Sequence, residues 1–201
     1  MGLEFYSLKK LLDDETLSEE EIQSKLLTFK CSRDSDLEGF LHKSAVSNEK
    51  RDLTRTYIAI EDDMRIAGYF SLNLRCGRVL PDCGLSKSRL KELNIQPDTN
   101  VAQMYLIAQV GRADDSPKGL GKLLMVEALN ILRRARDLVG CHVIRIDCKP
   151  ASSLIEYYEH YGFQQIRPDG GEGLMMMVLL LRDRYLWEHS ENPSESCSQP
   201  C

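Results

Sequence analysis

Two glycines ahead of a long apolar run are the first feature of this chain with a clear chemical use. Gly119 and Gly121 lie within the segment Ser116–Lys122, and no further proline or glycine follows before residue 140. Glycines let a backbone approach a ligand closely, and the first N–H groups of a helix have no partner inside it. Such a turn can hold a phosphate. Lys118 and Lys122 place positive charge at the helix end that normally disfavours cations, which indicates an anionic ligand.

The spacing of these residues excludes two common phosphate loops. Gly121-Lys122 is followed by Leu123, where a P-loop has serine or threonine. Leu124 occupies the third glycine position of a dinucleotide-binding fingerprint. A flexible helix entry with no ligand is the alternative interpretation of this segment.

A basic segment from Arg75 to Lys91 is the second candidate site. It has five basic residues and one acid, Asp82, in a chain of net charge −5. Such a patch can follow a nucleic-acid backbone, and Arg55 could join it from a neighbouring strand. A solvated loop and helix face would explain the same charges. The five residues are Arg75, Arg78, Lys87, Arg89 and Lys91.

The loop needs strands and helices to position it, and residue patterns predict them on both sides. Residues 54–63 and 65–75 read as an antiparallel hairpin that turns through Glu61–Asp63. Strand–helix–strand–helix–strand follows, which implies a parallel or mixed sheet with crossover helices. The strands are expected over 100–111, 142–149, 163–168 and 173–182, and the helices over 118–140 and 152–162.

Weaker patterns predict the remaining elements. Ser18 followed by Glu21 is typical of a helix start, and 25–31 reads as a first strand. Helices are expected over 32–50 and 86–93. In the long helix, one stripe is expected to be core: Leu120, Leu124, Ala128, Ile131, Ala135 and Leu138.

Length and composition predict one α/β domain. The chain has 201 residues, of which 42% are hydrophobic. We expect a charged extension over 1–23, the domain over 24–187 and a disordered tail over 188–201. No apolar run approaches the roughly 20 residues of a membrane helix, and no signal-peptide pattern is visible, so the chain reads as cytoplasmic. Seven scattered cysteines, Cys76, Cys141 and Cys148 among them, predict packing thiols and no metal.

The order of these elements resembles the GNAT superfamily of acyl-CoA-dependent N-acetyltransferases. The family's pyrophosphate signature is Gln/Arg-x-x-Gly-x-Gly/Ala, and this chain has Ser116-Pro117-Lys118-Gly119-Leu120-Gly121. Tyr158 lies four residues before Gly162-Phe163, as in the family. The chain departs from the family at Ser116 and at Ala151, where Asn is usual. The resemblance implies a mixed, mostly antiparallel sheet, splayed between strands 4 and 5 and flanked by helices.

The same resemblance implies acetyl-CoA as cosubstrate and a direct attack by a primary amine. Tyr158 would be the general acid, because a tyrosine hydroxyl with a pKa of about 10 suits a departing thiolate. Tyr157, Tyr158 and Tyr161 could instead all be packing aromatics. The implied cofactor-binding residues are Gln109, Val110, Arg112, Ser116, Lys118, Gly119, Leu120, Gly121 and Lys122.

Upstream motifs resemble one branch, the toxin-type acetyltransferases of bacterial toxin–antitoxin pairs. They are Phe29-x-Cys31, Arg55-Thr56-Tyr57 and Gly68-Tyr69-x-Ser71-Leu72. The branch acetylates the α-amine of aminoacyl-tRNA, which implies charged tRNA and an antitoxin as partners. The chain could also form a homodimer. The tRNA would contact Arg55, Arg75, Arg78, Lys87 and Arg89.

Two alternatives to this acceptor stay open at the level of sequence. One is a GNAT enzyme that acts on a small-molecule or protein amine, and the other is a non-catalytic acyl-CoA-binding module. No general base stands out among Glu156, Glu159 and His160. An α-amine, with a pKa of about 7.7–8.0, needs a base less than a lysine amine does.

Overall fold

The computed structural model describes residues 2–96, 98–166 and 173–181. Its strands are β1 (Leu3–Ser7), β2 (Arg55–Glu61), β3 (Ile66–Arg78), β4 (Val101–Arg112), β5 (Val143–Cys148), β6 (Gln164–Ile166) and β7 (Met175–Leu180). Its helices are α1 (Leu8–Leu12), α2 (Glu19–Leu26), α3 (Ser35–Lys43), α4 (Ala45–Lys50), α5 (Lys87–Glu92), α6 (Leu120–Val139) and α7 (Ser152–Glu159).

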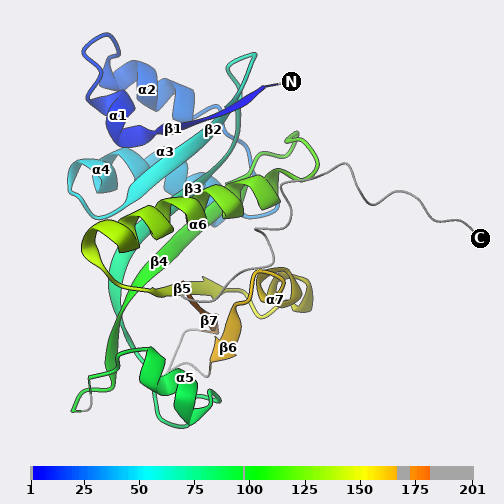
Figure 1. The fold of residues 1–201 in the computed structure, drawn as a ribbon. Helices are drawn as coiled ribbons and strands as arrows, with labels where there is room; N and C mark the ends of the chain where they lie inside the picture. The colour runs from blue at the N-terminus through cyan, green and yellow to red at the C-terminus, as the bar shows by residue number, and fades with distance from the viewer. Residues whose placement is uncertain (1, 97, 167–172, 182–201) are drawn as a thin grey trace, which may run out of the picture. The chain divides into compact units, whose positions relative to one another are not determined.

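The described strands form one mixed sheet in the order β1-β2-β3-β4-β5-β7-β6, flanked by helices (Figure 1). β4 runs parallel to β5, and the other neighbours are antiparallel. The predicted α/β class and mixed, mostly antiparallel sheet are therefore confirmed. The chain divides into two compact units, residues 1–74 with 105–138, and residues 75–104 with 139–201.

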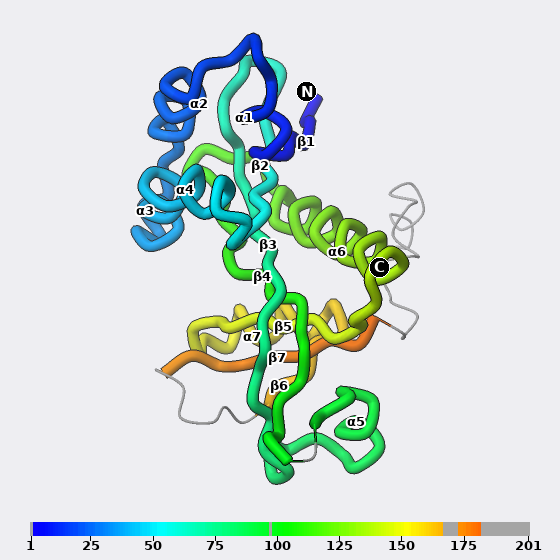
Figure 2. Tube along the Cα trace, turned by 90° about the vertical axis from the view of Figure 1, so that its left-hand side faces the viewer, coloured from blue at the N-terminus to red at the C-terminus, as the bar shows by residue number. Residues whose placement is uncertain are grey.

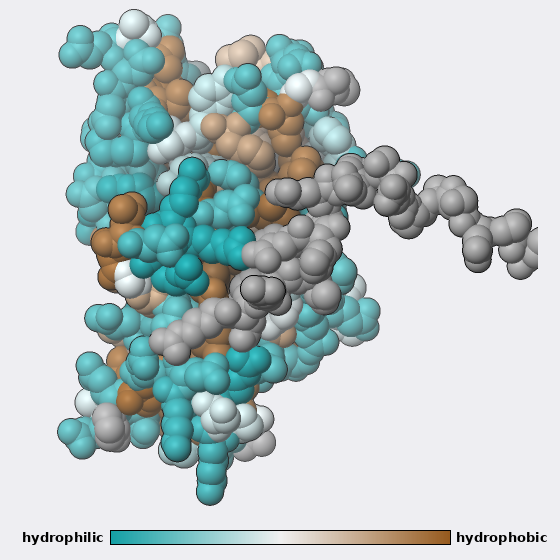
Figure 3. Space-filling view, in the orientation of Figure 1, coloured by the Kyte–Doolittle hydropathy of each residue, from teal (hydrophilic) through white to brown (hydrophobic). Residues whose placement is uncertain are grey.

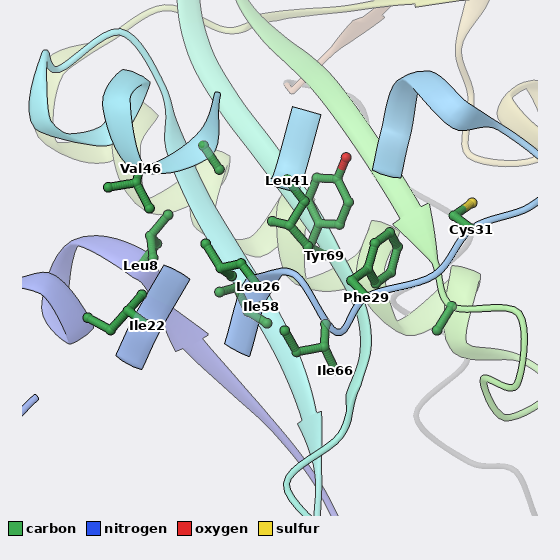
Figure 4. Packing of buried hydrophobic residues seen from close by; sticks show 12 residues of the cluster. Leu8, Ile22, Leu26, Phe29, Cys31, Leu41, Val46, Ile58, Ile66 and Tyr69 are labelled. Carbon is green, nitrogen blue, oxygen red and sulfur yellow. The ribbon is translucent and has the colours of Figure 1, made fainter. Parts of the chain in front are cut away.

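The first unit builds its core on both faces of β2 and β3. α2, α3 and α4 lie on one side of these strands and α6 on the other (Figure 2). On the side of α2, α3 and α4, Leu26, Leu41 and Ile58 pack around Tyr69 (Figure 4). The Tyr69 ring meets Phe29 edge-on at 5.4 Å between centroids, and its hydroxyl donates to the Leu37 carbonyl oxygen at 2.7 Å. The predicted hairpin of β2 and β3 is confirmed.

The N-terminal region differs from the expectation. Residues 3–7 form β1, which pairs antiparallel with β2 from Leu3↔Glu61 to Ser7↔Tyr57. The predicted capping box is present, since Ser18 and Glu21 bond each other's main-chain amides. The strand predicted over 25–31 is wrong, because α2 continues through Leu26 and its last residues bury apolar side chains against other helices. The boundary expected at residue 24 falls inside α2.

The helix predicted over 32–50 is divided into α3 and α4 at Ser44. Glu49, near the end of α4, is fully buried and joins that helix to β2. Its carboxylate accepts the Thr56 amide at 2.7 Å and Arg55 Nη1 at 3.3 Å. Burial nevertheless raises the pKa of Glu49, because removal from water penalises the charged form more than these partners favour it.

Glu49→Gln is expected to change the pH dependence of stability. With its pKa raised, folded Glu49 binds a proton more readily than unfolded glutamate, so its contribution to stability is full below about pH 4.3, the unfolded pKa. The contribution is lost as pH rises through the folded pKa. As pH rises from the unfolded to the folded pKa, the free energy of unfolding of the wild type should therefore fall relative to that of Glu49→Gln. Urea denaturation at a series of pH values would measure this difference. Parallel profiles would contradict the raised pKa.

α6 packs its buried face on β3 and β4 in the same unit. The buried residues are Leu120, Leu124, Met125, Ala128, Leu129 and Leu132. The stripe predicted from Leu120 to Leu138 is wrong at its end, where Leu138 is 84% exposed. The stripe averages 3.6 residues per turn, so Leu138 lies on the same side of the helix as Leu120. Leu138 is exposed because the buried part of α6 ends at Leu132. Figure 3 shows apolar residues at this end of α6.

Gly68 sets how closely α6 approaches the sheet. A Cβ built at Gly68 would lie 2.7 Å from the Gly111 carbonyl oxygen and about 3.0 Å from Leu124 Cδ1. Gly68→Ala should therefore lower the free energy of unfolding by about 1–3 kcal/mol through overpacking. Gly39→Ala, in the interior of α3 with nothing within 4 Å of the added Cβ, is the matched control. It should stabilise the protein by about 0.5–1 kcal/mol. Equal effects in urea denaturation would refute this account of Gly68.

The second unit has its own core beneath β5, β6 and β7. β7 pairs antiparallel with β5 from Val143↔Leu180 to Cys148↔Met175, and with β6 on its other edge. α5 begins at the predicted place, where the Ser86 hydroxyl accepts the Arg89 amide at 3.3 Å. Val79, Leu93, Met104 and Val178 are among the residues buried in this core.

Several expectations concern single residues or segments outside the described part of the chain. Cys31, Cys83 and Cys148 are buried, but Cys76 is exposed, so its prediction as a packing thiol is wrong. Among the described residues, no group of three or more His, Cys, Asp or Glu side chains could hold a metal ion. Within the same residues, no helix combines the length and apolarity that a membrane span requires. The tail expected over 188–201 lies outside the described residues.

Candidate functional site: a glycine loop, a tyrosine helix and a basic segment

The glycine loop connects β4 to α6 as predicted. Gly119 has φ +86°, a conformation that L side chains rarely adopt, and no atom lies within 4 Å of a Cβ built there. The amides of Leu120 and Lys122 donate to Pro117 and Gly119 carbonyl oxygens at 3.3 and 3.0 Å. Within the described part of the chain, the amides of Lys118 and Gly119 donate to no acceptor. The loop therefore offers two main-chain donors beside an open space.

The acidic residues beside this loop interact with other parts of the unit, so the two lysines dominate the charge of the loop. Asp114 accepts the Ser32 amide at 3.0 Å, and this backbone hydrogen bond lowers the pKa of Asp114. Asp115 forms an ion pair with Arg65. Lys118 and Lys122 are exposed, and neither has an acidic partner among the residues that the structure describes. Such a loop suits an anion with several oxygens, such as a pyrophosphate.

The end of β4 holds the other predicted cofactor-binding residues. Gln109, Val110 and Arg112 are half-buried. Between them, Gly111 is buried, and a Cβ built there would lie 2.7 Å from Tyr69 Cε1. The Arg112 carbonyl oxygen accepts Arg33 Nη2 at 3.3 Å, while the Arg112 guanidinium has no partner in the described residues. The first unit thus brings Gln109 through Lys122 together, with Ser116 half-buried and Leu120 buried in the core.

Tyr158 lies on α7 in the second unit, with its ring half-buried among aromatic side chains. Its centroid is 5.2 Å from that of Tyr157 and 5.9 Å from that of Phe163. Burial, and secondarily the Cys148 thiol, raises the pKa of Tyr158 to about 12. The Tyr158 hydroxyl has no hydrogen bond within the described residues. It is therefore protonated at neutral pH and able to donate to a ligand.

The neighbouring groups on α7 are less suited to this task. Tyr161 is 3% exposed, and its hydroxyl donates to the Tyr157 hydroxyl at 3.5 Å. Glu156 and His160 are exposed. Glu159 accepts the Gln165 side-chain amide at 2.7 Å. The N-cap residue of α7, Ala151, makes no side-chain hydrogen bond to the helix.

The basic segment falls mostly within the second unit. Arg75, Arg78 and Lys87 are exposed, whereas Arg89 is half-buried and pairs with Glu92 at 3.2 Å. Arg55 belongs to the first unit, where it pairs with the carboxylates of Glu49 and Asp52. The second unit therefore contains four of the five residues expected to contact tRNA.

A polar pocket of about 310 Å³ beside this segment was not expected from the sequence. Its walls come from β3, the chain after α5, β4 and the residues that lead into β5. Three carboxamide side chains line it, from Asn94, Gln96 and Gln103. The sequence signal nearest this pocket is Asn94, because asparagine is a residue type that adopts a positive φ after a helix. Here its φ is +51°, after the end of α5.

The strand order and the helix after β4 are those of the GNAT acetyltransferase fold. No protein-family model and no curated protein sequence matches the chain. Solved structures do match it. AtaT complexed with acetyl-methionyl-tRNAfMet is 20% identical, with a TM-score of 0.67 over 90% of this chain and 96% of that one. A tyrosine-to-phenylalanine variant of KacT is 16% identical, with a TM-score of 0.67 over the same shares of the two chains.

A third match is an AtaT variant toxin bound to the C-terminus of the antitoxin AtaR and acetyl-CoA. It is 17% identical, with a TM-score of 0.62 over 90% of this chain and 94% of that one. At these identities the likeness establishes the fold of the chain.

Proposed function

We propose that this chain is an acetyl-CoA-dependent N-acetyltransferase of the toxin type. The loop Ser116–Lys122 carries the proposal, because it combines two unengaged amides, an open glycine and two lysines without acidic partners. An acyl-CoA pyrophosphate matches this chemistry. The fold shared with AtaT, which has been solved with acetyl-CoA, supports the same ligand.

The residues of this chain suit each step of the transfer. Lys118 and Lys122 bind the pyrophosphate, and main-chain amides near Gln109 and Val110 polarise the thioester carbonyl. The amine attacks that carbon, the C–S bond breaks, and the Tyr158 hydroxyl gives its proton to the departing sulfur. The proton that the amine loses goes to solvent or to the deprotonated tyrosine, which restores the acid. Ser116 replaces a longer donor, so the two lysines supply most of the phosphate binding.

The proposed acceptor is the α-amine of an aminoacyl-tRNA. AtaT has been solved with acetyl-methionyl-tRNAfMet, and the exposed cations Arg75, Arg78 and Lys87 can follow a nucleic-acid backbone. An α-amine with a pKa of about 7.7–8.0 is partly neutral at pH 7, so it needs no strong base. We also propose a cytoplasmic location, a homodimer and an antitoxin partner, as AtaT binds the C-terminus of AtaR.

Thermal stabilisation tests the cofactor half of this proposal. Acetyl-CoA at 100 times its Kd should add about 2.7 kcal/mol to the free energy of unfolding. S-acetyl-N-acetylcysteamine, which has the thioester but no pyrophosphate, should add none at the same concentration. Absence of any shift with acetyl-CoA would overturn both this proposal and a non-catalytic acyl-CoA-binding role. Thermal stabilisation by acetyl-CoA without acetyl transfer to any amine would support only the non-catalytic acyl-CoA-binding role.

A further inference from the structure

The polar pocket beside the basic segment has a composition that suits a neutral, hydrogen-bonding ligand. Asn94, Gln96 and Gln103 each present a carbonyl acceptor and an amino donor. Leu93 and Val101 add apolar surface, and no lysine, arginine, aspartate or glutamate is among the described residues that line the pocket. Its volume of about 310 Å³ lies at the lower end for small-molecule sites.

Two of these carboxamides are unengaged. The side chains of Asn94 and Gln103 make no hydrogen bond within the residues that the structure describes. By contrast, Gln96 Oε1 already accepts the Thr99 hydroxyl at 3.3 Å. Asn94 and Gln103 are therefore able to meet both a donor and an acceptor of a ligand at once.

The pocket wall is held in an unfavourable backbone conformation. Cys141 has φ +63°, which is uncommon for a residue other than glycine, asparagine or aspartate. Asn94, another lining residue, has φ +51°, which asparagine adopts readily after the end of a helix. Two hydrogen bonds hold the segment at Cys141: the Cys141 thiol donates to the Gln103 carbonyl oxygen at 3.4 Å, and His142 Nε2 donates to the Glu92 carbonyl oxygen at 2.6 Å. Backbone strain of this kind collects at ligand sites.

Exposed cations continue from the pocket along the chain. Cys76 lines the pocket, and because successive side chains of a strand point to opposite faces, Arg78 lies on the same face of β3 as Cys76 and Arg75 on the other. Arg75 and Lys87 have no acidic partner within the described part of this unit. A neutral carboxamide pocket flanked by cations matches a nucleotide, with the base in the pocket and a phosphate on Arg78.

We propose that this pocket binds one unstacked base of a single-stranded RNA segment. The proposal deepens the proposed function, on which it rests for charged tRNA as the natural source of that segment. Asn94 and Gln103 read the base edge, and Arg78 contacts an adjacent phosphate. A base held in this way would fix the register of the RNA on the second unit.

Binding of a short RNA tests the proposal without any acetyl transfer. The probe is a fluorescein-labelled single-stranded RNA tetranucleotide, together with four versions that each lack one base. Fluorescence anisotropy of the full chain should show a loss of about tenfold in affinity when one particular base is removed. Equal affinities across the abasic series would overturn the proposal.

Variants then place the base in this pocket. Gln103→Leu should lower affinity for the intact RNA by about tenfold. Removal of the base should then cause no further loss of affinity in this variant. Asn94→Gly, which suits the positive φ, removes the other carboxamide without strain and should behave alike. Gln165→Leu, an exposed carboxamide of the same unit that bonds Glu159, should match the wild type. Arg78→Ala should weaken all five RNAs equally and reduce the salt dependence of binding.

Two results separate this proposal from the proposed function. If Gln103→Leu and Asn94→Gly both keep the full loss of affinity when the base is removed, the pocket does not bind the base. That result would overturn the proposal even if the protein acetylates tRNA. Base dependence that both variants abolish would support the pocket even if no acetyl transfer occurs.

Discussion

Tyr158→Phe is expected to lower turnover by about 100-fold to 10,000-fold, the usual contribution of a positioned general acid. The substitution removes only the hydroxyl, which has no hydrogen bond within the described residues. The edge-on ring contacts with Tyr157 and Phe163 remain. Folding and acetyl-CoA affinity should therefore be unchanged, and steady-state kinetics with calorimetry would measure both. A variant with wild-type turnover would remove Tyr158 from the mechanism.

The pH profile adds a second readout for Tyr158. Burial raises its pKa to about 12, so the hydroxyl stays protonated throughout the range in which the protein can be assayed. Turnover should rise as the acceptor amine loses its proton and then level off. Loss of activity with an apparent pKa near 10 would contradict the raised value. Tyr161→Phe is the matched control, and because its hydroxyl already bonds Tyr157 we expect near wild-type turnover.

Charge reversal at the glycine loop is expected to have the other large effect. The double variant Lys118→Glu and Lys122→Glu should raise the Kd of acetyl-CoA by at least about 10-fold, because two attractive charges at the phosphates become repulsive. Both side chains are exposed and lack acidic partners in the described residues, so the fold should not change. Isothermal titration calorimetry would measure the Kd.

Two controls define what this loop does. Lys10→Glu reverses an exposed charge on α1 in the same unit and should leave the Kd unchanged. Raising the salt concentration should weaken acetyl-CoA binding in the wild type more than in the double variant, since exposed charges are screened. An unchanged Kd in the double variant would refute the pyrophosphate assignment.

Long periodic segments made most of the fold predictable from the sequence. α6 and the β2–β3 hairpin carry their hydrophobic pattern over many residues, and both are present. The five residues of β1 are too few for a periodic signal, and pairing with β2 decides their conformation. Residues 25–31 have strand-like composition, but the capping box at Ser18 starts a helix that runs through Leu26.

The candidate site was predictable where its residues are consecutive. Ser116–Lys122 shows its glycines and lysines in one short stretch, and Tyr158 is identified by its distance from Gly162-Phe163 in the sequence. The carboxamide pocket was not predictable, because Cys76, Gln103 and Cys141 come from segments far apart in the chain. Pairing of Arg55 with Glu49 is likewise a tertiary event, since α4 must first pack on β2.

Acetyl transfer itself is the most direct test of the central claim. Radiolabelled acetyl-CoA would be incubated with the full chain and, in parallel, with aminoacyl-tRNA, peptides and polyamines as acceptors. The account predicts that label appears on the α-amine of aminoacyl-tRNA, that uncharged tRNA stays unlabelled, and that Tyr158→Phe abolishes most of the transfer. Labelling of peptides or polyamines alone would contradict the acceptor, and no labelling of any amine by a protein that binds acetyl-CoA would contradict the enzyme.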